Sequence, residues 1–216
     1  MTGRRDTSPR RYNLPTFKAP NVVLVEGPDE FEFIRFLQKR EDVQIHSYEG
    51  KDQLRLEIKT ILGVEGFEDV RRVLIVRDSD SDPIAARASV LSQWSAALSC
   101  PIPNPLPTAG WFPDSTNREW NVTLLPDQSS TGDLESLLWR AVDASDHTNC
   151  IDALIRCLKN CSPVPVTSLT KARLYAWLAT QKEPCKQLDW ALNPKASLFD
   201  PNHPAFRDFA NLLDSL

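Results

Sequence analysis

The apolar residues of the first 125 positions fall into four short runs separated by segments of mixed polarity. Residues 21–26 (NVVLVE) and 72–77 (RVLIVR) are apolar at nearly every central position. Such runs are typical of parallel strands that are buried on both faces. Residues 43–47 (VQIHS) alternate between apolar and polar, and residues 119–125 (EWNVTLL) form a fourth run that Pro126 ends. The pattern therefore predicts four strands.

The segments between and after these runs carry apolar residues at helical spacing. Residues 51–62 show this most clearly, since four leucine and isoleucine side chains share one face. Asp82 followed by Pro83 is a typical helix start, with Asp82 as the N-cap. Further helices are predicted at residues 31–40, 83–98, 134–142, 150–161, 170–180 and 204–216.

Strands that alternate with helices predict an α/β fold with a parallel sheet. We expect a Rossmann-like central parallel sheet of about four strands, with flanking helices and a helical C-terminal extension. Three parts are expected along the chain: a flexible basic N-terminal tail at 1–20, the α/β core at 21–130, and a helical part at 131–216 that completes the same domain.

The charge balance limits how this protein can bind its ligands. The chain has 216 residues, with 25 Lys and Arg against 29 Asp and Glu, and a net charge of −4. This balance argues against a protein that coats nucleic acid by charge alone. With only seven glycines, the chain also lacks a Gly-rich phosphate loop.

Two further patterns concern location. No stretch approaches about 18 uninterrupted apolar residues, so we expect no membrane-spanning segment. The first eleven residues lack the apolar core of a signal peptide, and the five widely spaced cysteines suit reduced thiols. We therefore expect a cytoplasmic protein.

Two acidic clusters follow the first and third predicted strands. Residues 26–30 read Glu-Gly-Pro-Asp-Glu, and residues 78–82 read Asp-Ser-Asp-Ser-Asp. Ligands of an open parallel sheet bind beyond the carboxyl ends of its strands, where these two loops can converge. Like charges gathered there are costly unless a cation neutralises them. Because oxygen ligands suit Mg²⁺ and Mn²⁺, and two such ions can clamp a phosphodiester, the clusters indicate a divalent-metal site.

The same clusters carry a resemblance to a known family. A strand followed by Glu26-Gly27 and, about fifty residues later, a strand followed by Asp78-x-Asp80 resembles the Toprim domain of topoisomerases, bacterial primases and related nucleases. This resemblance covers about residues 20–130 and implies a Toprim-like version of the sheet. The later segments PDQSSTGDLESLLW and TKARLYAWLA look like parts of small stand-alone Toprim proteins and OLD-family nucleases.

The resemblance to OLD-family nucleases implies two metal ions, Mg²⁺ or Mn²⁺. Glu26, Asp78 and Asp80 would hold one ion, and Lys171 would be the basic partner that stabilises phosphate charge. The same pattern is open to plainer interpretations: Asp78 and Asp80 as turn or capping residues, and Lys171 as a surface lysine.

The second ion would be held by Glu30 together with Asp133 or Glu135. Acids two positions apart on a helix point to different faces, so Asp133 and Glu135 can both point inward only if Asp133 lies in the loop before the helix. Glu135 is equally open to interpretation as a first-turn acid that complements a helix dipole.

These residues imply a metal-dependent nuclease that cleaves nucleic-acid phosphodiester bonds, with DNA expected over RNA. A topoisomerase needs a separate DNA-gripping domain and a primase a zinc module, neither of which is seen in the chain. OLD-like nucleases work with ATPase domains, often in defence against phage. Because the chain has no Walker motif, the resemblance implies an ATPase subunit in trans; a homo-oligomer is also open.

Two alternatives remain. One is a non-catalytic Toprim adaptor or regulatory subunit, and the other a haloacid-dehalogenase-like phosphatase, in which Asp-x-Asp also follows a strand. Zinc is not expected, because the spacing of His147, Cys150, Cys157 and Cys161 matches no common zinc module, and Cys157 and Cys161 are expected to be buried free thiols.

Overall fold

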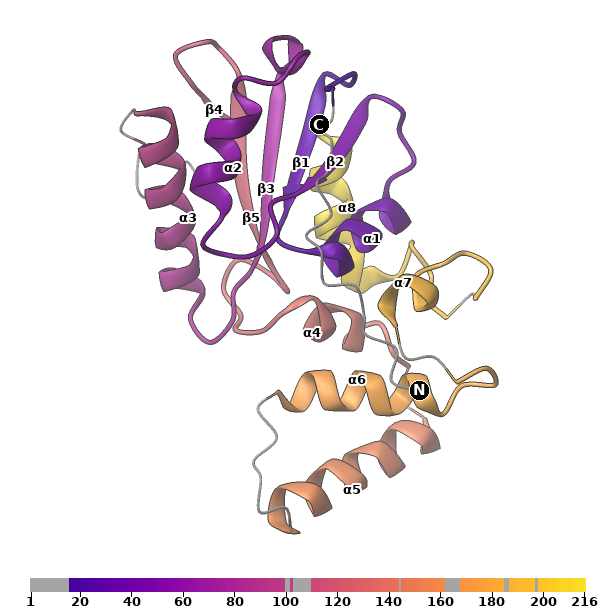
Figure 1. The fold of residues 1–216 in the computed structure, drawn as a ribbon. Helices are drawn as coiled ribbons and strands as arrows, with labels where there is room; N and C mark the ends of the chain where they lie inside the picture. Colours follow the sequence, from indigo (N-terminus) through magenta and orange to yellow (C-terminus); the bar gives the residue numbers. More distant parts are fainter. Residues whose placement is uncertain are drawn as a thin grey trace, which may run out of the picture.

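A five-stranded sheet forms the centre of the computed structural model, which describes residues 16–99, 102, 110–143, 145–161, 168–184, 187–196 and 198–216 (Figure 1). The strands are β1 (Asn21–Val25), β2 (Val43–Ser47), β3 (Arg72–Asp78), β4 (Phe112–Pro113) and β5 (Glu119–Leu125). Their order is β2-β1-β3-β5-β4, with β4 antiparallel to β5 and the other pairs parallel. The predicted α/β class and parallel sheet are confirmed, and β4 is an additional short edge strand.

The predicted helices occur in the expected order, most with shifted ends, and α7 is an additional short helix. Their bounds are α1 Pro28–Leu37, α2 Leu54–Ile61, α3 Pro83–Leu98, α4 Leu134–Trp139, α5 Asp146–Cys161, α6 Leu169–Ala179, α7 Leu188–Ala191 and α8 Arg207–Asp214, with short 3₁₀ turns at Phe67–Asp69 and Pro204–Phe206. Asp82 caps α3 as predicted, because its side chain accepts hydrogen bonds from the backbone N–H groups of Ile84 and Ala85. No helix within the described ranges combines the length and apolar character needed to cross a membrane.

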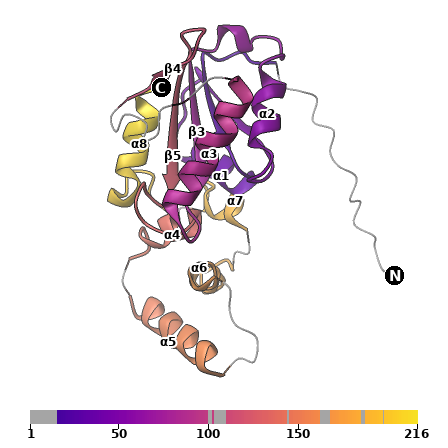
Figure 2. The same cartoon turned by 90° about the vertical axis from the view of Figure 1, so that its left-hand side faces the viewer.

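Helices cover both faces of the sheet (Figures 1 and 2). Leu24 and Ile75 face α2 and α3, whereas Val25 and Val76, the next residues along the same strands, face α1 and α8. This alternation is the period of two expected for strands buried on both sides. Burial of two such cores contributes the main hydrophobic stabilisation. The α5–α6 hairpin lies beyond α4, away from the sheet (Figure 2).

The segment before β1 joins the second of these cores. Phe17 is buried, and its ring lies 5.0 Å from that of Phe67. Its backbone N–H donates to the carbonyl of Glu65. Residues 16–20 therefore pack on the body, which corrects the expected end of the tail at residue 20, because Phe17 gains a buried position there. Residues 1–15 of the expected tail lie outside the described part of the chain.

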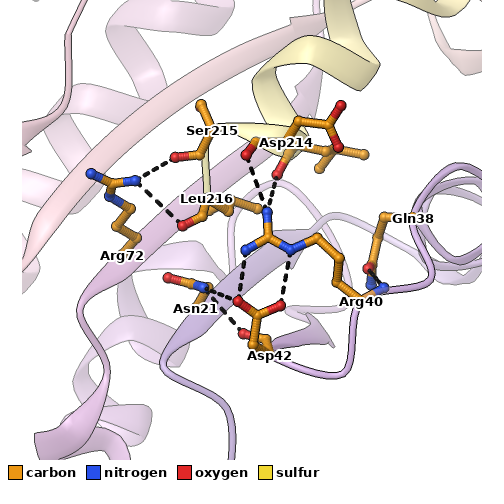
Figure 3. Close-up of polar contacts among 9 residues, drawn as sticks. Asn21, Gln38, Arg40, Asp42, Arg72, Asp214, Ser215 and Leu216 are labelled. Atoms are coloured by element: carbon orange, nitrogen blue, oxygen red, sulfur yellow. Dashed lines mark hydrogen bonds and ion pairs between the residues drawn. The ribbon is translucent and has the colours of Figure 1, made fainter.

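Two arginines hold the last residues of the chain against the amino ends of the strands (Figure 3). Arg40 donates to the carbonyls of residues 213–214 at 3.3 and 3.2 Å, and its guanidinium forms a two-pronged ion pair with Asp42 at 2.9 and 2.6 Å. Arg72 donates to the carbonyls of residues 215–216. These bonds add side-chain donors to the backbone carbonyls at the end of α8, where the regular helical hydrogen bonds stop.

Candidate functional site

The predicted site residues gather at the carboxyl edge of the sheet, next to the point where the strand order reverses between β1 and β3. From β1 the chain passes to β2 on one side, and then crosses back to β3 on the other side of β1. Loops that leave neighbouring strands in opposite directions open a crevice, which is where open α/β sheets bind ligands. A cleft of about 1240 Å³ opens here, lined among others by Glu26, Glu30, Asp78 and Lys171.

Asp78 is the last residue of β3 and the most strongly perturbed acid of the cleft. Its Oδ1 accepts a hydrogen bond of 3.0 Å from the backbone N–H of Leu134, at the start of α4. Burial, together with the negative charges of Glu30 and Glu135, raises the pKa of Asp78 to about 9. A buried acid among other acids favours its neutral form until a cation arrives.

Glu30 lies in the first turn of α1 and is 9% exposed. Burial, together with the charges of neighbouring acids that include Glu26, raises its pKa to about 7. Gly27 leaves room for this carboxylate, because a Cβ at that position would stand 3.0 Å from Oε2 of Glu30. The Gly of the Glu26-Gly27 pair thus permits close approach of the Glu30 side chain.

The start of α4 supplies two more acids. Asp133 is the N-cap, and its Oδ1 accepts from the backbone N–H and hydroxyl of Ser136 at 3.0 and 2.7 Å. Since Asp133 precedes the first helical turn, it and Glu135 both reach Lys171: Nζ of Lys171 lies 3.0 Å from Oε1 of Glu135 and 3.8 Å from Oδ2 of Asp133. Asp133 and Glu135 can both point toward the cleft because Asp133 lies just before the helix, as the two-residue spacing required.

Lys171, in the first turn of α6, is the cation of this half of the cleft. Burial raises the pKa of Glu135, and the Lys171 ion pair opposes that shift. Burial alone would lower the pKa of Lys171, but the hydrogen bond to Glu135 and the surrounding carboxylates outweigh it, and the pKa rises above its ordinary value. Lys171 therefore stays charged and links α6 to α4.

Glu26 and Asp80 lie on the other side of the site, in a hollow of about 360 Å³ that Lys51 also lines. Burial raises the pKa of Glu26, and the charge of Asp80 adds to it, whereas Arg77 and Lys51 oppose it. Nε of Arg77 lies 3.4 Å from Oε2 of Glu26, and the Arg77 side chain is 5% exposed. We did not anticipate Arg77 or Lys51 from the sequence.

The loop that carries Asp80 has an unusual backbone held by hydrogen bonds. Asp80 has a φ of 51°, and its carbonyl accepts from the backbone N–H of Gly132 at 2.7 Å. The fully buried hydroxyl of Ser79 lies 2.7 Å from the carbonyl of Ser130, to which it donates. A left-handed residue outside glycine is costly and persists where neighbouring contacts hold it. The β3 and β5 loops are thereby joined at the site.

The structure thus brings all seven predicted site residues to one edge, but in two groups. Asp78 belongs with Glu30, Asp133, Glu135 and Lys171, and the second group is the Glu26 and Asp80 hollow. Glu26 connects the groups, since it lines the large cleft and its charge also acts on Asp78.

No group of three His, Cys, Asp or Glu side chains within the described ranges is already arranged to hold a metal ion. The donors nevertheless fit a divalent cation: they are carboxylate oxygens, and burial and mutual repulsion raise the pKa values of Glu30 and Asp78. Lys171 and Arg77 supply part of the positive charge that these acids require. A bound divalent ion would relieve the remaining repulsion.

The cysteines of α5 are placed differently from the prediction. Cys157 and Cys161 are exposed free thiols, as is Cys150. Helix α5 buries only the face of Ile151 and Ile155, and the cysteines lie outside it. The expectation of buried thiols was therefore wrong, because this helix packs against α6 and not against the main core.

A family model described as "Protein of unknown function (DUF3226)" matches residues 20–216. Comparison with curated proteins and with solved structures found no match.

Proposed function

Because the chain belongs to the DUF3226 family, whose description assigns no function, we propose a function from the cleft itself: metal-dependent cleavage of nucleic-acid phosphodiester bonds at a Toprim-like site. The observation that carries this proposal is the convergence of acids after β1, on α1 and at the end of β3 on one cleft that also contains Lys171, which in turn pairs with Glu135 of α4. Such a set suits a reaction in which charge builds up on phosphate oxygens.

The acids would hold one or two Mg²⁺ or Mn²⁺ ions through Asp78, Glu30 and Glu135 on one side and through Glu26 and Asp80 on the other. Bound there, the ions would activate water and stabilise the leaving oxygen. Nζ of Lys171 would donate to a non-bridging phosphate oxygen once its carboxylate partners turn to the metal. Arg77 would keep Glu26 oriented from behind, since its guanidinium is buried and cannot reach solvent.

The proposal extends to partners, each supported by the sequence resemblance alone. DNA is the preferred substrate, an ATPase subunit would act in trans, and the setting would be anti-phage defence in the cytoplasm. Within such an assembly the chain itself would be present as a monomer or as a homo-oligomer.

A non-catalytic adaptor is the second candidate, and one observation favours it. Lys171 already neutralises Glu135, and Arg77 already lies beside Glu26, so part of the acidic charge is balanced by the chain itself. An adaptor that no longer binds metal would need this internal balance.

A nicking assay separates the two candidates. Supercoiled plasmid and a labelled RNA are incubated with Mn²⁺ and either the wild type, Asp78→Ala or Asp69→Ala, an exposed acid outside the cleft. We expect cleavage by the wild type and Asp69→Ala, with a loss of at least about 100-fold in Asp78→Ala. Calorimetry should detect Mn²⁺ binding that Asp78→Ala weakens. Absence of both cleavage and metal binding in the wild type would favour the adaptor.

A further inference from the structure

We propose that Lys51 binds a phosphate group that flanks the scissile one, on the side of the acidic cluster opposite Lys171. The substrate would then be a phosphate-backbone polymer and not a phosphomonoester. This inference rests on the proposed nuclease function and names a residue that grips its substrate.

Lys51 is held in place by a loop that is fixed to the end of β1. The backbone N–H of Gly50 donates to the carbonyl of Glu26 at 3.0 Å. The carbonyl of Lys51 accepts from the Nε2 of Gln93 at 2.9 Å and from Nη1 of Arg77 at 3.4 Å. The backbone of Lys51 also lies close enough to the Glu26 carboxylate to lower its pKa. The position of the main chain at Lys51 therefore follows the acidic cluster directly.

The side chain of Lys51 is exposed beside this fixed backbone. It lines the smaller hollow with Glu26 and Asp80, and among the described residues its ammonium group forms no ion pair. Its positive charge lowers the pKa of Glu26, although the ammonium group forms no direct ion pair with that carboxylate. A cation placed in this way next to a cluster of acids is available to an anionic ligand.

The two hollows adjoin each other beside the acidic cluster. The smaller hollow and the large cleft share Glu26, Glu49, Gly50 and Gln53 as lining residues. Lys51, in the β2–α2 connection, lines the smaller hollow, and Lys171, on α6, lines the large cleft. A ligand that crosses the acids between them meets a cation on each side.

Two cations separated by the reacting centre suit a substrate with more than one phosphate. In a nucleic-acid strand, phosphates on either side of the scissile bond can bind cations while the middle one reaches the acids. A phosphomonoester has a single phosphate, which occupies the reacting centre and leaves Lys51 without a ligand. A single diester without neighbouring phosphates also leaves Lys51 without a ligand.

The experiment compares wild type, Lys51→Ala, Lys51→Arg and Lys59→Ala, which removes an exposed lysine of α2 outside both hollows. Fluorescence anisotropy with a labelled 20-nucleotide DNA strand, in Ca²⁺ to prevent turnover, gives affinity at several salt concentrations. We expect Lys51→Ala to bind roughly 5- to 10-fold more weakly and its salt dependence to fall by about 0.7 in slope, the contribution of one phosphate contact on a single strand. Lys51→Arg and Lys59→Ala should behave like the wild type.

Hydrolysis with Mn²⁺ provides the second readout. Lys51→Ala should raise KM for the DNA strand with little change in kcat, and should affect hydrolysis of bis(p-nitrophenyl) phosphate, a lone diester, far less than hydrolysis of DNA. Wild-type affinity and salt slope in Lys51→Ala, in a protein that cleaves DNA, would overturn the role of Lys51 alone. A wild type that binds DNA with the expected Lys51 dependence and never cleaves it would refute the nuclease and leave the phosphate contact standing. A wild type that does not bind DNA would refute both.

Discussion

Replacing Asp78 by asparagine should stabilise the metal-free protein. The pKa of Asp78 rises from its ordinary value of 3.8 to about 9, because the side chain is buried among other acids. Below pH 3.8 the carboxyl is neutral in both the folded and unfolded states and costs nothing. As the pH rises, the unfolded chain releases its proton first, so the folded state loses relative stability until the pH reaches about 9.

The magnitude follows from this gap. At pH 7 the gap from 3.8 is about 3 pH units, which corresponds to an upper limit of about 4 kcal/mol, whereas at pH 5 the limit is about 2 kcal/mol. We expect roughly 1–3 kcal/mol at pH 7, because local relaxation and water in the cleft screen the charge. The amide keeps an oxygen that can accept the hydrogen bond from the backbone N–H of Leu134.

Urea unfolding in EDTA at pH 5 and pH 7 measures this effect. Asp78→Asn should exceed the wild type in free energy of unfolding, and by more at pH 7 than at pH 5. Asp69→Asn, at an exposed position, should remain within about 0.5 kcal/mol of the wild type at both pH values. A destabilised Asp78→Asn, or an advantage that shrinks as the pH rises, would show that the raised pKa of Asp78 does not impose the cost we infer.

Two further predictions concern the fold. Gly66→Ala should lower the free energy of unfolding by at least about 2 kcal/mol, because Gly66 has a φ of 85° and a Cβ there would stand 1.9 Å from the carbonyl oxygen of Phe17. Gly63→Ala is the control: a Cβ there would stand 3.7 Å from the nearest atom, the carbonyl oxygen of Thr60, so stability should change by less than about 1 kcal/mol in urea titration. Arg40→Ala should lower the free energy of unfolding by about 1 kcal/mol and speed hydrogen exchange in the last turn of α8. Arg55→Ala, at an exposed position of α2, should alter neither quantity. Unchanged exchange in Arg40→Ala would show that Arg40 does not hold the end of α8.

The parts of the fold that depend on local pattern could be predicted from the sequence. The buried runs of β1 and β3 are unmistakable because both faces of these strands lie in a core, and Asp82 has the capping role its neighbours suggest. The two-residue strand β4 and the four-residue helix α7 are too short to carry a periodic pattern. Both exist through tertiary contacts, which local sequence does not encode.

The site was predictable to a similar degree. Parallel strands bring Glu26 and Asp78 to one edge whatever the loops do, so their proximity follows from fold class. How the acids divide, and which cations face them, depends on side-chain direction and loop course. Arg77 could have been recognised as a site residue from the sequence, because an arginine at the end of a buried strand requires an acidic partner. In the structure that partner is Glu26. Lys51 offered no such signal, because lysines before a helix are common on surfaces.

The alternation of Arg77 and Asp78 along β3 has a consequence for how this protein can change. Because adjacent residues of a strand point to opposite faces, Arg77 is on the face of α2 and α3, and Asp78 on the face of α1 and α4. Substitutions in one core therefore reach one half of the acidic edge and leave the other in place. Substitutions on one face can therefore change the contact between Arg77 and Glu26, and substitutions on the other face the pKa of Asp78, while the sheet between them stays the same.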